Sequence, residues 1–255
     1  MKIVACQLPY VHQDIDSALG KILEYGAKAD SQGARLVCYP ECYLQGYVFA
    51  DENTERLALN ISSGRFDGIL KRLAHLDPIL VIGLIEADEQ RLYYTAVIVK
   101  AGKVLGRYRK THLRPGESMF DAGSDYPVFE VDGLRFGINI CNDLNFPNCA
   151  KAISDQKAGL LVCPCNNMMG KGSAEVWKHK HNEIRAKRAV ETSLWLVSSD
   201  VTGDWAGRVS FGPTAVIDPN GSVVEQVQLL EEGLVLHEIA VEKPVQRVSA
   251  GRTRA

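Results

Sequence analysis

Apolar β runs and helical patterns alternate at the start of this chain, and this alternation limits the folds open to it. Residues 2–8 form one apolar run, and residues 35–39 form a second. Between them, apolar residues recur at helical spacing after Asp14 or Asp16, either of which can cap a helix. A second strand–helix–strand alternation follows in the later part of the sequence. Such alternation predicts an α/β sheet system with helices on the outside.

Hairpin signals dominate the middle of the chain. Ala101-Gly102 separates one pair of β runs, and Asp132-Gly133 separates another. Because hairpins join antiparallel strands and strand–helix–strand units join parallel ones, the sheets are predicted to be mixed. Further strands are predicted at 78–85, 93–100, 103–107, 128–131, 134–140, 160–163, 194–198, 214–217, 222–227 and 234–239, and further helices at 66–75, 147–156 and 174–192.

The domain organisation is predicted to be simple. The sequence has no repeat of solenoid length, no low-complexity tract and no linker, so a single domain is expected over residues 1–240. A chain of 255 residues is within the range of one α/β domain. The segment 241–255 has little apolar content and is expected to leave the core as an arm.

Charge and hydropathy exclude several classes of function. The net charge is −2, which argues against a nucleic-acid partner. No apolar run reaches the length of a transmembrane helix, so no membrane partner is expected. The N-terminus enters a strand at once without a signal-peptide profile, and cytoplasmic residence is the resulting expectation. The seven cysteines are odd in number and often lie in apolar runs, which favours reduced thiols over disulfides.

The apolar run at 134–140 stops at Cys141, where residues that cannot sustain a strand begin. Asn142, Asp143 and the residues up to Pro147 suit a turn that opens a helix. A cysteine at a strand-to-helix corner holds its thiol outward, near helix N–H groups that can favour a thiolate and receive an oxyanion. This arrangement resembles the nucleophile elbow of serine hydrolases. The alternative for a lone cysteine is a small buried core residue.

Glu41 and Lys110 occupy comparable places, since each follows a predicted strand directly. The ends of sheet strands gather on one rim, where α/β proteins commonly place their active sites. An acid, an amine and the Cys141 thiol meeting there would form a base, a cationic stabiliser and a nucleophile. Taken singly, Glu41 or Lys110 is better explained as a solvated surface charge.

Together, the neighbourhoods of Glu41, Lys110 and Cys141 resemble the nitrilase (carbon–nitrogen hydrolase) superfamily, whose catalytic set is Glu, Lys and Cys in that chain order. Residues 107–113, Arg-Tyr-Arg-Lys-Thr-His-Leu, are similar to the family's lysine segment. In the loop after it, Glu117 matches a glutamate that recurs as a fourth active-site residue. Two more segments resemble the family's C-terminal glycine strand and its Asp-Pro-x-Gly turn: 211–214 and 217–221.

This resemblance extends over residues 2–240 and implies a four-layer α-β-β-α sandwich with mixed sheets. Members of the family usually pair their sheets into dimers or larger oligomers, so a homodimer or higher homo-oligomer is expected. The arm at 241–255 would then cross onto the neighbouring subunit. The family's chemistry implies neither a metal nor an organic cofactor.

The resemblance also implies hydrolysis through a covalent thioester on Cys141. A thiol at its ordinary pKa is only slightly ionised at neutral pH, so it needs a base beside it, and Glu41 would take this role. Lys110 and the backbone N–H of Asn142 would stabilise the oxyanion of the tetrahedral intermediate. Water activated by Glu41 or held by Glu117 would then release the acid.

The segment after Cys141 departs from the family pattern. Asn142, Asn145 and Asn148 replace an aromatic or other residue, an arginine and a glutamate, and hydrogen bonds between asparagines are expected in place of the lost charges. True nitrilases usually have Cys-Trp-Glu here, whereas amidase and formamidase members tolerate a polar residue after the cysteine. The expected function is therefore hydrolysis of a small linear amide to ammonia and a carboxylic acid. The alternatives are an N-carbamoyl (ureido) amidohydrolase and a catalytically weak scaffold.

Two rival sites involve histidine. His112 could act as the base in a Cys–His arrangement, which is the second mechanism to consider. Cys163-Pro164-Cys165 with His179 and His181 has the composition of a zinc site. Its cysteines lack the usual Cys-x-x-Cys spacing, and residues i and i+2 of a helix lie on different faces, so no metal is expected.

Residues that contact substrate are expected from loops near the strand ends and from the helix that follows. The loop at 43–49 contains Tyr47 and Phe49, and aromatic and methionine side chains suit the wall of an apolar cavity. A packing role is the alternative for each of them. The residues expected to contact the amide or ureido substrate are Tyr47, Asn166, Asn167, Met168 and Trp177.

Overall fold

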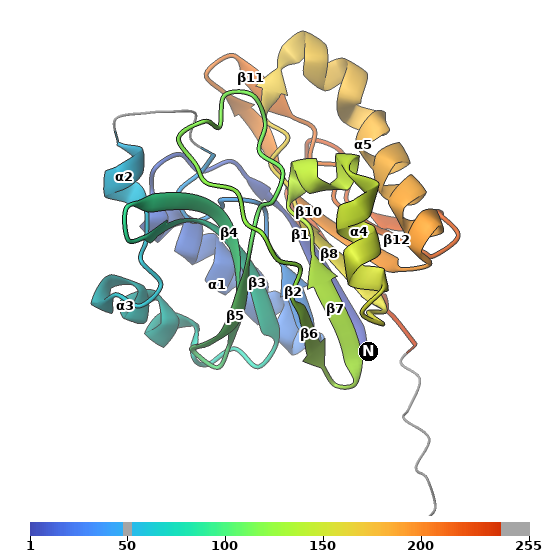
Figure 1. The fold of residues 1–255 in the computed structure, drawn as a ribbon, viewed down its shortest axis with the longest axis horizontal. Coiled ribbons are helices and arrows are strands. Elements are labelled where there is room, and N and C mark those ends of the chain that lie inside the picture. The colour runs from blue at the N-terminus through green and yellow to red at the C-terminus, as the bar shows by residue number, and fades with distance from the viewer. Residues whose placement is uncertain (48–52, 241–255) are drawn as a thin grey trace, which may run out of the picture.

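The computed structural model describes residues 1–47 and 53–240. These residues form one mixed sheet system with helices on both sides (Figure 1). Two expectations lie outside the described residues: the place of Phe49 and the arm at 241–255.

The described strands form a single connected sheet in which parallel and antiparallel pairs occur together. The strands are β1 Lys2–Pro9, β2 Leu36–Cys38, β3 Ile79–Asp88, β4 Arg91–Lys100, β5 Lys103–Arg109, β6 Val128–Val131, β7 Leu134–Ile138, β8 Leu160–Pro164, β9 Met169–Gly170, β10 Trp195–Trp205, β11 Arg208–Ser210, β12 Ala215–Ile217, β13 Val223–Gln226 and β14 Gly233–Glu238. Nine of them follow the order β5-β4-β3-β2-β1-β10-β8-β7-β6, and the other five pair beside this path. The strands β2, β1, β10, β8 and β7 pair in parallel, whereas β3-β4-β5 and β6-β7 are antiparallel hairpins.

The helices begin where the sequence offers a cap. The Asp14 carboxylate accepts a hydrogen bond from the Ser17 N–H at 3.0 Å, which selects it over Asp16 as the cap of α1. The helices are α1 Ile15–Ser31, α2 Thr54–Leu57, α3 Gly64–Leu73, the 3₁₀ helix η1 Cys141–Asn145, α4 Pro147–Ser154 and α5 Lys171–Thr192. None of these helices is long and apolar enough to cross a membrane.

Apolar packing at three depths confirms the four-layer sandwich. One cluster joins α1 and α3 to the first half-sheet, formed by β1–β5 and β14, and contains Leu19 and Val4. A second cluster, containing Ile3 and Ile138, lies between the first half-sheet and the second, formed by β6–β8, β10, β12 and β13. A third cluster, with Ile153, joins the second half-sheet to α4 and α5. The two helical layers lie on opposite faces in Figure 1.

The alternation along β1 shows why its sequence is mostly apolar. Val4, Cys6 and Leu8 belong to the cluster beneath α1, whereas Ile3 and Ala5 belong to the cluster between the half-sheets. Successive side chains of a strand point to opposite faces. Because β1 is covered on both faces, every position must be apolar or internally hydrogen-bonded.

The largest difference from the predicted elements concerns β10. A strand was predicted only at 194–198, but β10 continues to Trp205 and returns through Ala206 and Gly207, both with positive φ, into β11. The continuation contains Asp200, a residue that local preference assigns to a loop rather than a buried strand. Hydrogen bonding in the interior overrides that preference. The short elements α2, β9 and β11 were also not predicted.

Candidate active site

Glu41 lies just after β2, in a loop that packs closely against the neighbouring strand. A Cβ atom on Gly83 in β3 would meet the Pro40 carbonyl oxygen at 2.3 Å and the Glu41 Cα at 2.8 Å. On the other side, the Glu41 N–H donates to the Cys165 carbonyl at 3.1 Å. The backbone of Glu41 is therefore fixed between two strands, and the residue is only 1% exposed.

Lys110 ends the hairpin formed by β4 and β5 and points into the same interior. Its backbone N–H donates to the Tyr94 carbonyl at 2.8 Å. Its Nζ donates to Glu41 Oε1 at 2.8 Å and to Glu117 Oε1 at 3.0 Å. All three charged side chains are buried. Removing such charges from water is costly, and this cost is offset only when the charges pair closely. The structure thus brings together three of the residues that the sequence singled out.

Glu117 is held from two further directions. The Tyr47 hydroxyl donates to Glu117 Oε1, and the Arg114 backbone N–H donates to Oε2 at 2.8 Å. The Tyr47 ring stacks on Tyr94, with the ring centroids 5.3 Å apart. Tyr47 was expected to contact substrate, but it does not line the cavity described below. A buried tyrosine hydroxyl needs a partner, and here that partner is the Glu117 carboxylate.

Cys141 occupies the corner between β7 and η1 with a backbone φ of +42°. A non-glycine residue in this left-handed region is strained and must be held by its surroundings. Asp143 does so, because its Oδ2 accepts from the Ile140 N–H at 2.9 Å and from the Tyr108 hydroxyl at 2.8 Å. The α-helix begins only at Pro147, so the N–H groups nearest the thiol belong to η1.

Asn142 lies in the first turn of η1, where backbone N–H groups have no partner within the helix. Its side-chain Nδ2 donates to the His112 carbonyl at 3.0 Å, and its Oδ1 accepts from Asn145 Nδ2 at 2.9 Å. The expected hydrogen bond between asparagines is confirmed for this pair. Asn148 is exposed and takes no part in it.

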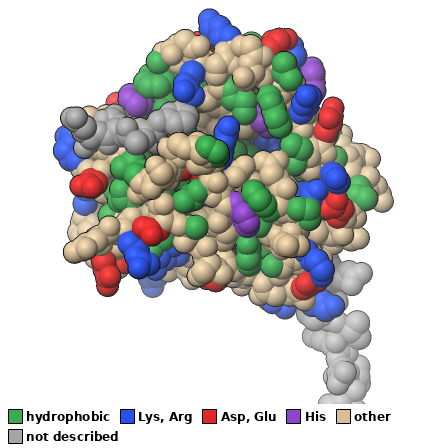
Figure 2. Space-filling view, turned by 45° about the horizontal axis from the view of Figure 1, so that its top comes forward, with side chains coloured by type: hydrophobic (Ala, Val, Ile, Leu, Met, Phe, Trp, Pro, Cys, Tyr) green, Lys and Arg blue, Asp and Glu red, His purple; other side chains and the backbone are tan. Residues whose placement is uncertain are grey.

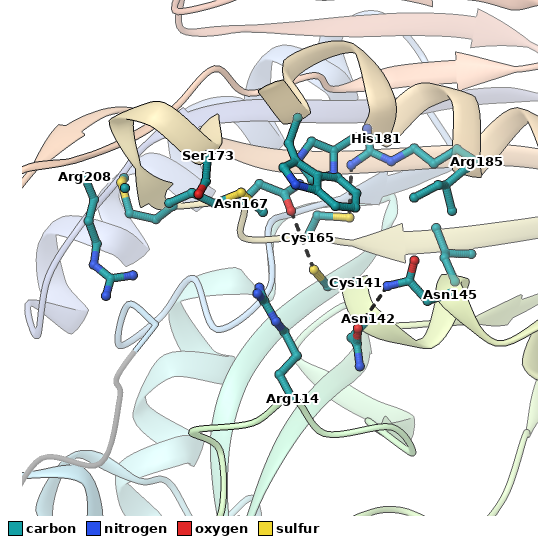
Figure 3. Close-up of a pocket in the computed structure, with 16 residues that line it drawn as sticks. Arg114, Cys141, Asn142, Asn145, Cys165, Asn167, Ser173, His181, Arg185 and Arg208 are labelled. Atoms are coloured by element: carbon teal, nitrogen blue, oxygen red, sulfur yellow. Dashed lines mark hydrogen bonds between the residues drawn. The ribbon is translucent and has the colours of Figure 1, made fainter. Parts of the chain in front are cut away.

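The Cys141 thiol opens onto a cavity of about 460 Å³ between η1, α5 and the ends of the central strands. Figure 3 shows Cys141 and Asn167 facing each other, with the sulfur 3.9 Å from Asn167 Oδ1. Met168 and Trp177 also line the cavity, as expected. Asn166 does not; it is buried, and its Oδ1 accepts from the Met168 N–H at 3.4 Å.

Burial and charge set the protonation states of the cluster. Burial, opposed by the charge of Lys110, raises the pKa of Glu41 to about 7. Burial alone would lower the pKa of Lys110, but the charges of Glu41, Cys141 and Glu117 raise it above its ordinary value. The pKa of Cys141 is raised by its hydrogen bond with Cys165 and by burial, so the resting group is a thiol. Among the described residues, Glu41 Oε2 is buried without a hydrogen-bond partner, as a base awaiting a proton would be.

No sequence motif marks the buried ion pair behind the cavity. Arg185 Nη2 lies 3.5 Å from Asp200 Oδ2 and donates to Cys165 Sγ at 3.2 Å. The Asn167 N–H donates to Asp200 Oδ1 at 3.0 Å, so the pair also fixes the residue that faces the nucleophile. Arg185 is one of many charged residues on α5, and no local signal shows which of them turns inward.

His112, Asp143 and Cys149 are a group of described residues with the composition of a metal site, and their ligand atoms lie within 4.8 Å of one another. Asp143 is already occupied by the Tyr108 hydroxyl and by backbone N–H groups. His112 Nδ1 lies 3.2 Å from Cys149 Sγ, and His112 does not line the cavity beside Cys141. These contacts fit a support for the strained corner better than a metal centre, and they provide no role for His112 as the base.

Comparison with known proteins agrees with this architecture. A family model described as carbon–nitrogen hydrolase matches residues 2–245. A nitrilase from Pyrococcus abyssi is 28% identical over 216 residues, covering 83% of this chain and 79% of that protein. The omega-amidase NIT2 of Homo sapiens is 29% identical over 232 residues, covering 85% of this chain and 80% of that protein.

A solved structure shares the fold along nearly the whole chain. The NitN amidase from Neterenkonia sp. AN1 superposes with a TM-score of 0.80 and 24% identity, covering 94% of this chain and 93% of that one. The family match includes the strand ends that carry Glu41 and Lys110 and the corner that carries Cys141. This chain belongs to the carbon–nitrogen hydrolase family, within the nitrilase superfamily, and is a hydrolase of carbon–nitrogen bonds.

Proposed function

We propose that this enzyme cleaves the C–N bond of a small linear amide through a thioester on Cys141, releasing ammonia and a carboxylic acid. One observation carries the proposal. Within the buried Glu41–Lys110–Glu117 cluster, Glu41 and Lys110 interact with the Cys141 thiol, which is held on a strained corner at the edge of a cavity. A nucleophile, a base and a cationic donor are therefore available without any rearrangement of the backbone.

In the first half-reaction, Glu41 removes the proton of Cys141 as the sulfur attacks the amide carbonyl carbon. A pKa of about 7 suits Glu41 to this role, because a base works best when its pKa lies near the working pH. Among the described residues, Lys110 Nζ spends two of its three donors on Glu41 and Glu117. The third is then directed to the developing oxyanion, together with the Asn142 N–H. One such donor typically contributes about 3–4 kcal/mol to the transition state.

The first half-reaction ends when the tetrahedral intermediate collapses and its C–N bond breaks. Glu41 returns the proton to the departing nitrogen, which leaves as ammonia, and the acyl group remains on Cys141 as a thioester. Water held near Glu117 then attacks the thioester carbon and gives a proton to Glu41. Release of the carboxylic acid returns that proton to the Cys141 sulfur.

Two further facts support an amide as the substrate. Known relatives of this chain include amidases, and a variant of the Nesterenkonia amidase carries acrylamide added at its active-site cysteine. The cavity beside Cys141 has the size expected for a small molecule. A scaffold without activity has no need of a buried charged cluster beside a strained thiol, which disfavours the non-catalytic alternative.

The decisive experiment measures ammonia release from a panel of linear amides, N-carbamoyl compounds and nitriles. Wild type is compared with Cys141→Ala and with Cys163→Ala, a matched change at a buried cysteine that does not line the cavity. We expect ammonia from amides in wild type and Cys163→Ala only, with an acyl adduct on Cys141 in the intact mass. Turnover of N-carbamoyl compounds alone would replace the amide assignment. Ammonia that is independent of Cys141, or none from any substrate, would overturn the proposal.

A further inference from the structure

We propose that Cys141 and Cys165 form a reversible disulfide when a hydroperoxide enters the cavity, and that Cys165 thereby protects the nucleophile from irreversible oxidation. The modification uses the same thiol as the proposed amide hydrolysis. It does not depend on which substrate the enzyme cleaves.

Cys141 is the cysteine that an oxidant in solution reaches first. The structure describes all seven cysteines; six are buried, and Cys141 is partly exposed. Cys141 and Cys165 line the cavity, and none of the other five does. Figure 2 shows acidic and basic side chains interspersed on the face in view, so this face has no field of one sign to attract an ion. Hydrogen peroxide is uncharged and small enough to enter a cavity of about 460 Å³.

The sheet places the two thiols side by side. β7 and β8 pair in parallel, with Ile138 opposite Val162. Cys141 and Cys165 each follow this pair by three residues, so they leave neighbouring strands at the same level. Neighbouring strands lie roughly 4.8 Å apart, which is within the Cα–Cα range of disulfides, about 4.4–6.8 Å. The two thiols are hydrogen-bonded to each other, and Figure 3 shows them on the same wall of the cavity.

The surroundings of Cys165 suit a thiol that attacks an oxidised neighbour. The hydrogen bond with Cys141 and the charge of Arg185 lower the pKa of Cys165, but the hydrogen bond with Cys163 and burial raise it further, so the resting group is a thiol. A thiol reacts slowly with peroxide, which leaves the first oxidation to Cys141 and its base. Arg185 Nη2 donates to Cys165 Sγ at 3.2 Å, and this cation stabilises the negative charge that develops on the attacking sulfur.

The oxidation consists of two balanced steps. In the first, Glu41 removes the Cys141 proton as the sulfur attacks one oxygen of hydrogen peroxide. The O–O bond breaks, the sulfur loses two electrons and becomes a sulfenic acid, and the second oxygen leaves with the proton as water. In the second step, Cys165 Sγ attacks the Cys141 sulfur and the S–O bond breaks. The hydroxyl group leaves with the Cys165 proton as a second water, and the disulfide remains.

The disulfide determines whether the damage can be repaired. A sulfenic acid that finds no thiol reacts with more peroxide to give a sulfinic acid, which thiol reductants do not reverse. A disulfide is opened by thiol exchange, which restores both cysteines. Disulfides in proteins of reducing compartments are usually transient in this way. Cys165 therefore converts a permanent loss of the nucleophile into a temporary one.

The test exposes the protein to hydrogen peroxide and follows intact mass, peptide cross-links and amide hydrolysis. We expect wild type to lose two hydrogen atoms, to contain a Cys141–Cys165 cross-link, and to lose activity that dithiothreitol restores almost completely. Cys165→Ser keeps a hydrogen-bonding group but cannot form the disulfide, so it should gain two oxygen atoms and recover little activity. Cys163→Ser is the matched control and should behave as wild type, although Cys163 Sγ lies 3.5 Å from Cys165 Sγ. Each variant is compared with its own activity before treatment.

Several outcomes would overturn the inference. They are a sulfinic acid or no change of mass in wild type, a cross-link between Cys163 and Cys165 instead, and equal recovery in wild type and Cys165→Ser. The wild-type cross-link is measured without any substitution, so this result does not depend on the folding of the variants. A protein that forms the Cys141–Cys165 disulfide but cleaves no amide would count against the proposed function alone.

Discussion

Lys110 Nζ donates to Glu41 Oε1 across 2.8 Å, and both side chains are buried almost completely out of contact with water. This contact links the charge state of the proposed base, Glu41, to that of the Lys110 cation beside it. Burial favours a neutral Glu41, whereas Lys110 favours an ionised one, and the resulting pKa of Glu41 is about 7. Several measurable consequences follow from this balance and from the packing around it.

The first prediction concerns the pH dependence of amide hydrolysis. Glu41 must be ionised to accept the thiol proton, so kcat/KM should fall about tenfold per pH unit below about pH 7, where this carboxyl becomes protonated. Glu41→Gln should lower kcat/KM by about 10²- to 10⁴-fold. Glu175→Gln, at an exposed position on α5, provides the matched control. Wild-type activity that stays constant from pH 8 to pH 5 would contradict the role of Glu41.

The same shift of pKa has a consequence for stability. The pKa of Glu41 in the folded state, about 7, lies above the ordinary glutamate value of 4.5 that applies to the unfolded chain. The stabilisation from the protonated form is therefore complete below the unfolded pKa and is lost as the pH rises through about 7. In Glu41→Gln, this decrease in the free energy of unfolding with rising pH should be absent, which unfolding measurements across the pH range would test.

The second prediction concerns Lys110 and stability. Lys110→Met leaves Glu41 and Glu117 buried without their cation, which should cost about 3–5 kcal/mol in free energy of unfolding at pH 8. Lys151→Met is the control, because Lys151 and Asp155 form an exposed pair with side chains 66% and 61% accessible. An exposed pair contributes at most about 1 kcal/mol. Urea unfolding of both variants measures the difference, and equal losses would contradict the buried role of Lys110.

The third prediction concerns the clearance at Gly83. Gly83→Ala places a methyl group against the Pro40 carbonyl and the Glu41 backbone, which should cost about 1–3 kcal/mol and displace the Glu41 carboxyl. We expect kcat/KM to fall by at least about tenfold, since small displacements of a catalytic group are costly. Gly68→Ala is the control, because a Cβ there meets nothing within 4 Å inside α3. This second variant should gain about 0.5–1 kcal/mol of stability and keep full activity.

The fourth prediction concerns Cys165. Its hydrogen bond with Cys141 is the largest cause of the raised Cys141 pKa, so Cys165→Ala should lower that pKa. The rate of Cys141 alkylation by iodoacetamide, followed by intact mass, should then rise at a lower pH than in wild type. Cys163→Ala should move the profile less, because Cys163 does not line the cavity. Identical profiles for wild type and Cys165→Ala would contradict this effect.

Sequence patterns were sufficient to place helices outside a mixed sheet and to identify the residues at the strand ends, whereas the four layers followed from the family resemblance. The buried first strand and a helix cap at Asp14 or Asp16 are local properties, and the structure contains both, with Asp14 as the cap. Chain order and motif spacing were also sufficient to select Glu41, Lys110 and Cys141 as one group. The length of β10 was underestimated because the strand contains Asp200. The residues that pair with Asp200 come from distant parts of the chain.

What the sequence determined by itself was therefore most of the longer elements and the identity of the residues placed at their ends, because backbone preference and apolar periodicity act over short stretches of chain. Only the tertiary structure decided how those residues interact. It assigned Tyr47 to Glu117 instead of the cavity, turned Arg185 inward onto Asp200 and left Arg114 facing Cys141. Protonation states and unpaired charges depend on burial and on neighbours that come from distant segments, and these exist only once the chain has packed.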